Sequence, residues 1–173
     1  LEQAQAAIDA FPGRFEQAYL ERFRAKLGLG EAHPEDAELI SDLLRTMAES
    51  SADFTNSFRA LCDAAEGAEE RFRLELRNEA SAGQWLHRWR QRLAVETAQP
   101  SDRAAGMRRE NPALIPRNHR IEAVIEAAVR GDISPFQDLL RALARPWVEH
   151  ADSYLYRNPP EPHEVVHQTF CGT

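Results

Sequence analysis

Apolar residues recur at steps of three and four along most of the chain, which is the spacing of one face of an α-helix. The first segment ends at Gly28 and Gly30, and Pro12 lies near its start or at a kink. The pattern predicts a single buried stripe on this helix, made of Phe11, Phe15, Tyr19, Leu20, Phe23 and Leu27.

The same spacing predicts six further helices after Gly30. They begin at about residue 35, at 53, at 81 (to about 97), at 102 (to 110), at 118 and at 134 (to 146). The expected fold class is therefore all-α, an irregular helical bundle or array of about seven helices with an extended Pro-rich C-terminal tail. We expect residues 1–146 to form a helical domain and residues 147–173 to form the tail.

Local signals mark some of the helix starts. Asp53 is a plausible N-cap. Ser134 and Gln137 have capping-box spacing, with Pro135 at the first helical position. The charged stretch 68–77 is interpreted as a solvated surface that carries a few apolar side chains, namely Phe72, Leu74 and Leu76.

Composition limits the class of protein. The chain has 173 residues, 43% of them hydrophobic, with a net charge of −7, so one compact core is possible and a nucleic-acid partner is not expected. Apolar runs are too short for a membrane span. The two cysteines, 109 positions apart, form no disulfide framework, which favours a reducing cytoplasm. The first residues already have the pattern of the middle of a helix, so we expect the chain to be cut from a longer protein.

Candidate chemistry is sparse. The sequence contains no phosphate-binding glycine loop, no HExxH, no GxSxG and no kinase HRD or DFG triplet, so no catalytic residue is assigned. Trp85 and Trp89, interleaved with arginines, have the composition of a nucleic-acid patch, but their helical spacing with Leu93 favours core packing. Cys62, beside Leu61, is expected to be buried.

One set of residues has metal-ligand chemistry. His163, His167 and Cys171 follow one another at four-residue spacing and are zinc-capable ligands. The spacing matches no standard zinc signature, and the segment is a chain end rich in proline. We therefore expect no metal site; the alternative is a zinc site made of these three residues.

Several motifs, taken in order, resemble the selenoprotein O (SelO/YdiU) family of protein adenylyltransferases over nearly the whole chain. They are FPGRF at 11–15 leading to KLGL at 26–29, DFTNSFRAL at 53–61, NP at 111–112, RN at 117–118, IEAA at 125–128, GD at 131–132, LL at 139–140 and the closing FCGT at 170–173.

The resemblance implies a parent protein with a kinase-like (pseudokinase) fold that binds ATP in an inverted orientation. With Mg²⁺ or Mn²⁺ it would transfer AMP to Ser, Thr or Tyr hydroxyls of protein substrates. The family's nucleotide and metal ligands lie N-terminal to this region, so no cofactor-binding residue is expected here. The family's C-terminal cysteine or CxxU motif makes Cys171 a redox candidate. This chain has no second cysteine there, which leaves open a disulfide to the kinase-like part.

Three functions follow as hypotheses. The first is a C-terminal accessory region that packs on the parent's N-terminal kinase-like domain, with Arg117 and Asn118 as contact candidates; Asn118 as the N-cap of the next helix is the equal alternative. The second is an independent protein-interaction module. The third is a zinc-binding helical domain.

Overall fold

The computed structural model describes residues 2–150 and 153–168. All regular elements in these ranges are helices, which confirms the all-α fold class. The chain divides into two compact units, residues 1–110 (unit 1) and 111–173 (unit 2). The predicted domain over residues 1–146 contains all of unit 1 and part of unit 2, and it stays a prediction.

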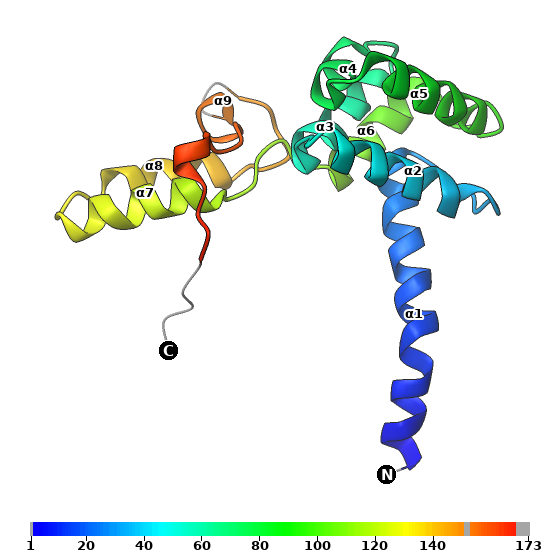
Figure 1. Ribbon diagram of the computed structural model, residues 1–173, viewed down its shortest axis with the longest axis horizontal. Helices are drawn as coiled ribbons and strands as arrows, with labels where there is room; N and C mark the ends of the chain where they lie inside the picture. Colours follow the sequence, from blue (N-terminus) through cyan, green and yellow to red (C-terminus); the bar gives the residue numbers. More distant parts are fainter. Residues whose placement is uncertain (1, 151–152, 169–173) are drawn as a thin grey trace. The chain divides into compact units, whose positions relative to one another are not determined.

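Unit 1 is built from six helices (Figure 1). They are α1 (Glu2–Leu27), α2 (Asp36–Glu49), α3 (Phe54–Ala64), α4 (Glu70–Leu76), α5 (Glu79–Leu93) and α6 (Pro100–Glu110). Helix α3 packs against α4 and α6, and α5 packs against α2 and α4. Only the end of α1 joins this group, where it meets α2, α3 and α6.

The core of unit 1 lies where α2 to α6 meet the last turn of α1. Its largest side chains include Trp89, Phe58 and Phe72, none more than 2% exposed. Trp89 Nε1 donates to the Leu27 carbonyl at 3.0 Å, and Trp85 Nε1 donates to the Leu39 carbonyl at 2.9 Å. Both tryptophans therefore belong to the core with their polar atoms satisfied, which confirms the packing interpretation.

The stripe predicted on the first helix is buried over only part of its length. Leu27 is fully buried and Phe23 packs against the core, but Phe11 and Phe15 are 63% and 59% exposed. The expectation of one buried stripe is therefore wrong for the amino-terminal half of α1. Pro12 lies inside this helix, where a proline costs about 3 kcal/mol because it removes a backbone donor and clashes with the preceding turn.

The charged stretch 68–77 is also corrected by the structure. It forms α4, in which Phe72 and Leu76 are fully buried while Leu74 is 76% exposed. The four-residue step from Phe72 to Leu76 places both side chains on the inner face of this short helix. Some of its charged groups are partly buried as well: Arg73 pairs at 3.0 Å with Glu69, which is 9% exposed.

Unit 2 contains α7 (Asn118–Val129), α8 (Ser134–Leu143), the short α9 (Ser153–Tyr156) and a 3₁₀ turn, η1 (Pro162–Glu164). Helices α7 and α8 pack side by side, and α9 contacts α8. The turn between α7 and α8 uses Gly131 at a φ of +90°, a conformation that favours glycine.

Two predicted caps have different outcomes. The Asp53 side chain accepts the Asn56 N–H at 2.8 Å and caps α3 as expected. Ser134 does not form the expected capping box, because α8 begins one residue earlier than that motif requires. Ser134 is instead the first helical residue and donates to Asp132.

Candidate functional site

The segment before α7 carries the residues that the sequence singled out for contact with another domain. It is anchored to the segment that follows α8, because the N–H groups of Ala113 and Leu114 both donate to the Pro146 carbonyl, at 2.7 and 3.1 Å. Ala113 and Leu114 are 3% and 1% exposed. This anchoring gives the segment between α6 and α7, called the connector below, a defined path into the first turn of α7.

A cleft of about 280 Å³ opens beside the start of α7. Apolar and polar side chains both line it: Ile115, Pro116, Arg117, Asn118, His119, Pro160, Glu164, Val165 and Val166. Within the tail, η1 is closed by a capping box, in which the Glu161 N–H donates to the Glu164 carboxylate at 2.9 Å. The tail and the connector thus form two walls of one cleft within unit 2.

Side chains of both charges line this cleft, with Arg117 in one wall and Glu164 in the other. Burial lowers the pKa of His119 below its ordinary value of 6.5, and Arg120 and Arg117 lower it further, while Glu164 opposes them. The hydrogen bond from the Glu161 N–H lowers the pKa of Glu164, and Arg120, 3.9 Å away, adds to this effect. The first turn of a helix also presents backbone N–H groups, so the cleft favours an acidic group over a basic one.

Arg117 and Asn118 occupy different environments at this helix start. Arg117 is the residue preceding α7 and is 9% exposed, whereas Asn118 is the first helical residue and is exposed. No side chain caps α7, so the alternative in which Asn118 is the N-cap is wrong. Asn118 is therefore available to a partner at the surface, and the guanidinium of Arg117 lies deeper in the cleft wall.

The metal and redox candidates are only partly within the described residues. His163 lies in η1 and His167 follows it in an extended segment, both exposed. Cys171 lies outside the described residues, so its predicted redox role stays a prediction. Within residues 2–150 and 153–168, no group of three or more His, Cys, Asp or Glu side chains could hold a metal ion. Cys62 is fully buried, and its thiol donates to the Phe58 carbonyl at 3.3 Å.

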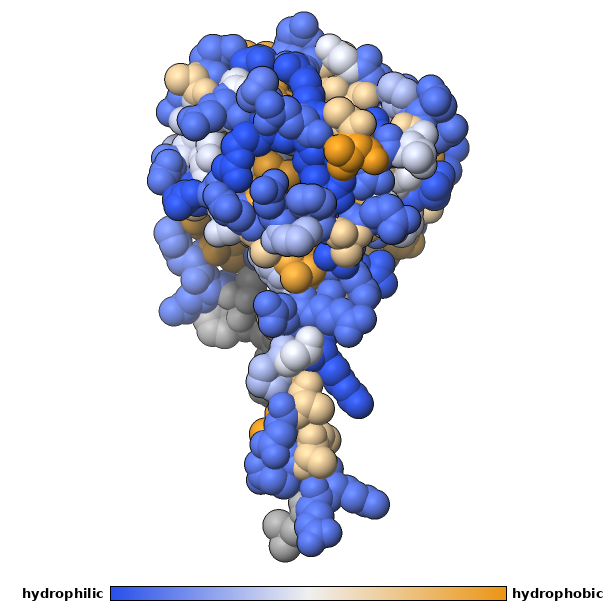
Figure 2. Space-filling model, turned by 90° about the vertical axis from the view of Figure 1, so that its right-hand side faces the viewer, coloured by the Kyte–Doolittle hydropathy of each residue, from blue (hydrophilic) through white to orange (hydrophobic). Residues whose placement is uncertain are grey.

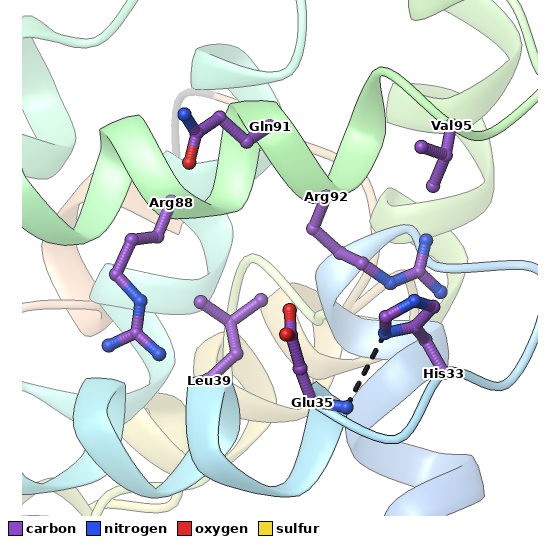
Figure 3. A pocket seen from close by; sticks show the side chains of 7 residues that line it. All are labelled: His33, Glu35, Leu39, Arg88, Gln91, Arg92 and Val95. Atoms are coloured by element: carbon purple, nitrogen blue, oxygen red, sulfur yellow. Dashed lines mark hydrogen bonds between the residues drawn. The ribbon is translucent and has the colours of Figure 1, made fainter.

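A second pocket lies in unit 1 between α2 and α5 (Figure 3). Arg92 points from α5 toward the loop that carries His33, Arg88 points from α5 toward α2, and Gln91 lies beside α5. The dashed line marks the hydrogen bond from the Glu35 N–H to His33 Nδ1, 3.4 Å long. The pocket is thus bordered by a basic helix face and an ordered loop.

Arg92, which lines this second pocket, is held by acceptors around it. Arg92 donates to Asp36 at 2.8 Å, to Glu96 at 2.7 Å and to the Glu31 carbonyl at 2.5 Å. Burial alone would lower the pKa of Arg92, but the hydrogen bonds to Asp36 and Glu96 raise it. Because the guanidinium is committed to these partners, it joins α2 to α5 and the loop and has little capacity left for a ligand.

Sequence reasoning missed two of these features. His119 gave no signal because it is a single histidine directly after the RN motif at 117–118, and only its burial makes it unusual. Asp36 and Arg92 are 56 positions apart, and neither has a local pattern that distinguishes it from an exposed charge. The one usable signal was the helical period, which places Arg92 three residues after Trp89, close to the buried stripe of α5.

Comparison with known proteins gives a consistent result. A family model described as "Protein adenylyltransferase SelO" matches residues 1–144. A Rhodopseudomonas palustris (strain BisB18) protein named protein nucleotidyltransferase YdiU is 51% identical over 98% of this chain and 35% of its own length. Relatives of the same name from Rhizobium etli (strain CIAT 652) and Agrobacterium fabrum are 47% identical, covering 100% and 99% of this chain. The chain thus spans about a third of the length of the curated relatives it matches.

Proposed function

Because this chain belongs to the SelO family of protein adenylyltransferases, we propose that it is the C-terminal accessory region of a longer nucleotidyltransferase. The observation that carries this proposal is 51% identity along nearly the whole chain to a protein named nucleotidyltransferase that is almost three times as long. In the parent, a kinase-like domain would transfer AMP to protein substrates, and this region would stabilise or gate that domain.

The proposed reaction assigns the chemistry to the kinase-like domain. A Ser, Thr or Tyr hydroxyl oxygen of a protein substrate would attack the α-phosphorus of ATP, form a new P–O bond and release pyrophosphate, while the hydroxyl proton passes to a base. ATP and Mg²⁺ or Mn²⁺ would bind in the parent's kinase-like domain. We place the enzyme in the cytoplasm, where ATP is available. In the described part of the chain, no helix is long and apolar enough to cross a membrane.

The cleft beside α7 supports the accessory role. Exposed Asn118 offers its side-chain amide as a hydrogen-bond donor to an acidic or carbonyl group on the kinase-like domain, and Arg117 lines the same cleft. The connector is fixed by two backbone hydrogen bonds, so this donor is held in position before a partner arrives. Cys171, in the tail that follows this cleft, would be the thiol that links the region to the parent.

The test combines this chain with the separately expressed remaining part of the parent. ATP labelled at the α-phosphate and a generic protein substrate report AMP transfer, and size-exclusion chromatography reports binding. We expect the pair to associate and the rate of transfer to change by at least about tenfold, as an integral part of the enzyme requires. Asn118→Ala should weaken the association, whereas Glu70→Ala, at an exposed position of α4, should not. An unchanged rate without association would reject the accessory role.

A second function is favoured by the surface of unit 2. Two exposed apolar pairs at four-residue spacing lie on α7 and α8, namely Ile125 with Val129 and Phe136 with Leu140, each at least 47% exposed. Such surfaces suit an independent protein-interaction module that recruits substrates. Binding of this chain to a purified substrate of the parent, without the kinase-like domain, would favour this second function over the accessory role.

A further inference from the structure

The amino-terminal part of α1 extends away from the rest of unit 1, and residues 2–18 are all exposed (Figure 1). At a rise of 1.5 Å per residue, this exposed part is about 25 Å long. Ile8, Phe11 and Phe15 lie on one side of it and are 66%, 63% and 59% exposed. We call these three residues the α1 stripe. Figure 2 shows hydrophobic side chains along the projecting helix among hydrophilic ones.

The α1 stripe continues into the core of unit 1 through a row of aromatic rings. The ring centroids of Phe11 and Phe15 are 6.0 Å apart, and those of Phe15 and Tyr19 are 6.2 Å apart. Tyr19 contacts Phe23 at 4.6 Å, and Phe23 contacts the buried Phe58 at 5.9 Å. A partner that covers the stripe would therefore extend an existing core and would not have to form a separate one.

The projecting helix has little capacity to persist by itself. Pro12 lies inside it and leaves the Ile8 carbonyl without its helical donor, and Gly13 follows directly with open space around its Cα. Both residues are poor helix formers, and the stretch before Pro12 is shorter than the about 12–15 residues below which an isolated helix is marginal in water. Helical structure from Glu2 onward is consequently expected to depend on tertiary contacts made by the α1 stripe.

A second copy of this chain is a poor match for that contact. Each stripe residue would contribute on the order of 100 Å² of apolar surface, so two facing stripes would bury about 600 Å². Stable protein–protein interfaces bury about 1,200–2,000 Å² in total. A partner in the same polypeptide needs far less area, because the covalent connection supplies a high effective concentration.

We propose that the α1 stripe is the docking surface for the remaining part of the full-length enzyme, which would provide an apolar groove for Ile8, Phe11 and Phe15. This inference rests on the proposed function, in which the chain is one region of a longer protein. The relatives are long enough to contain such a groove, because about two thirds of each lies outside the region that matches this chain. The anchors follow the helix-in-groove pattern, at positions i, i+3 and i+7.

The test measures amide hydrogen exchange of residues 2–15 in this chain alone and in the full-length enzyme that contains it. Open residues of an uncovered helix exchange rapidly, whereas a docked helix exchanges only through an opening reaction. We expect exchange to be slowed by at least about 100-fold in the full-length enzyme. The core amides of α5 serve as an internal standard, because Trp89 and Leu86 are buried in either form.

Matched variants locate the contact. The double variant Phe11→Ser/Phe15→Ser should speed up the exchange of residues 2–15 in the full-length enzyme by at least about tenfold. Leu74→Ser is the control, because Leu74 is a large apolar residue of α4 that is 76% exposed and lies outside the stripe. Protection of residues 2–15 should be unchanged by this control substitution.

Each outcome of these measurements decides one of the two proposals. Equal exchange in the two forms would overturn the proposal, and so would protection in this chain alone, either as a monomer or in a concentration-dependent dimer. AMP transfer is measured on the same full-length sample. Protection without AMP transfer would reject the proposed activity and keep the docking surface, whereas AMP transfer without protection would reject only the docking surface.

Discussion

Arg92 of α5 holds the carboxylate of Asp36 at the start of α2, with 2.8 Å between Nε and Oδ1. Both side chains lie inside unit 1, at 8% and 1% exposure, and the Asp36 carboxylate also accepts the His33 N–H at 2.9 Å. The pair therefore joins two helices and the loop before α2 in the interior of the unit.

Removing one partner of this buried pair is expected to be costly. Arg92→Ala would leave the Asp36 carboxylate buried without its cation, and we expect a loss of about 3–5 kcal/mol in the free energy of unfolding. Arg45→Ala is the control, because Arg45 pairs with Asp42 at the surface and should cost about 0–1 kcal/mol. Urea unfolding followed by tryptophan fluorescence, with Trp147→Phe in the background, would measure both. Similar losses for the two variants would contradict the structural role of Arg92.

Gly28 is expected to tolerate a side chain only at a cost in stability. Its φ is +73°, and an added Cβ would lie 2.7 Å from Arg103 Cγ and 2.8 Å from Met107 Sδ. Gly67 has a similar φ of +97° with open space around it. Gly67→Ala should therefore cost only the backbone strain, about 1–2 kcal/mol, whereas Gly28→Ala should cost at least about 1 kcal/mol more. Thermal unfolding of the two variants compares them directly, and an equal shift in Tm would show that α6 moves aside without penalty.

The cap of α3 offers a smaller and well-defined test. Asp53→Ala removes the acceptor of the Asn56 N–H and should cost about 1 kcal/mol. Glu35 occupies the equivalent position before α2, but its side chain makes no capping hydrogen bond, so Glu35→Ala should change stability by less than about 0.5 kcal/mol. Chemical denaturation measures both, and a larger effect at Glu35 would be inconsistent with the described caps.

The environment of His119 predicts a pH dependence. Its pKa is lowered in the folded state relative to 6.5, so the unfolded chain binds the proton more readily. The neutral imidazole therefore contributes stability that is fully present above about pH 6.5 and is lost as the pH falls toward the folded-state pKa. His119→Gln should weaken this dependence between pH 7.5 and 5.5. Titration of the His119 ring by NMR gives an independent measure, and a midpoint at or above 6.5 would refute the buried environment.

The helical elements and several of their ends followed from the sequence. Helical spacing identified the segments that became α2, α5 and α7, and the Asp53 cap was assigned correctly, because these features depend on residues within a few positions of one another. Short and charged α4 was missed, since two buried residues among many charges give too weak a period. The ordered motifs also indicated the family, which the comparisons then established.

Sequence by itself determined that this protein is all-helical, where most helices begin and which family it resembles, because local spacing and motif order carry that information. Only the tertiary structure decided that Phe11 and Phe15 are exposed while Phe23 is packed against the core on the same predicted stripe. It also decided that Arg92 meets Asp36 and that His119 is buried. The physical reason is that burial and ion pairing depend on which distant elements approach a residue, and periodicity along one helix does not specify them.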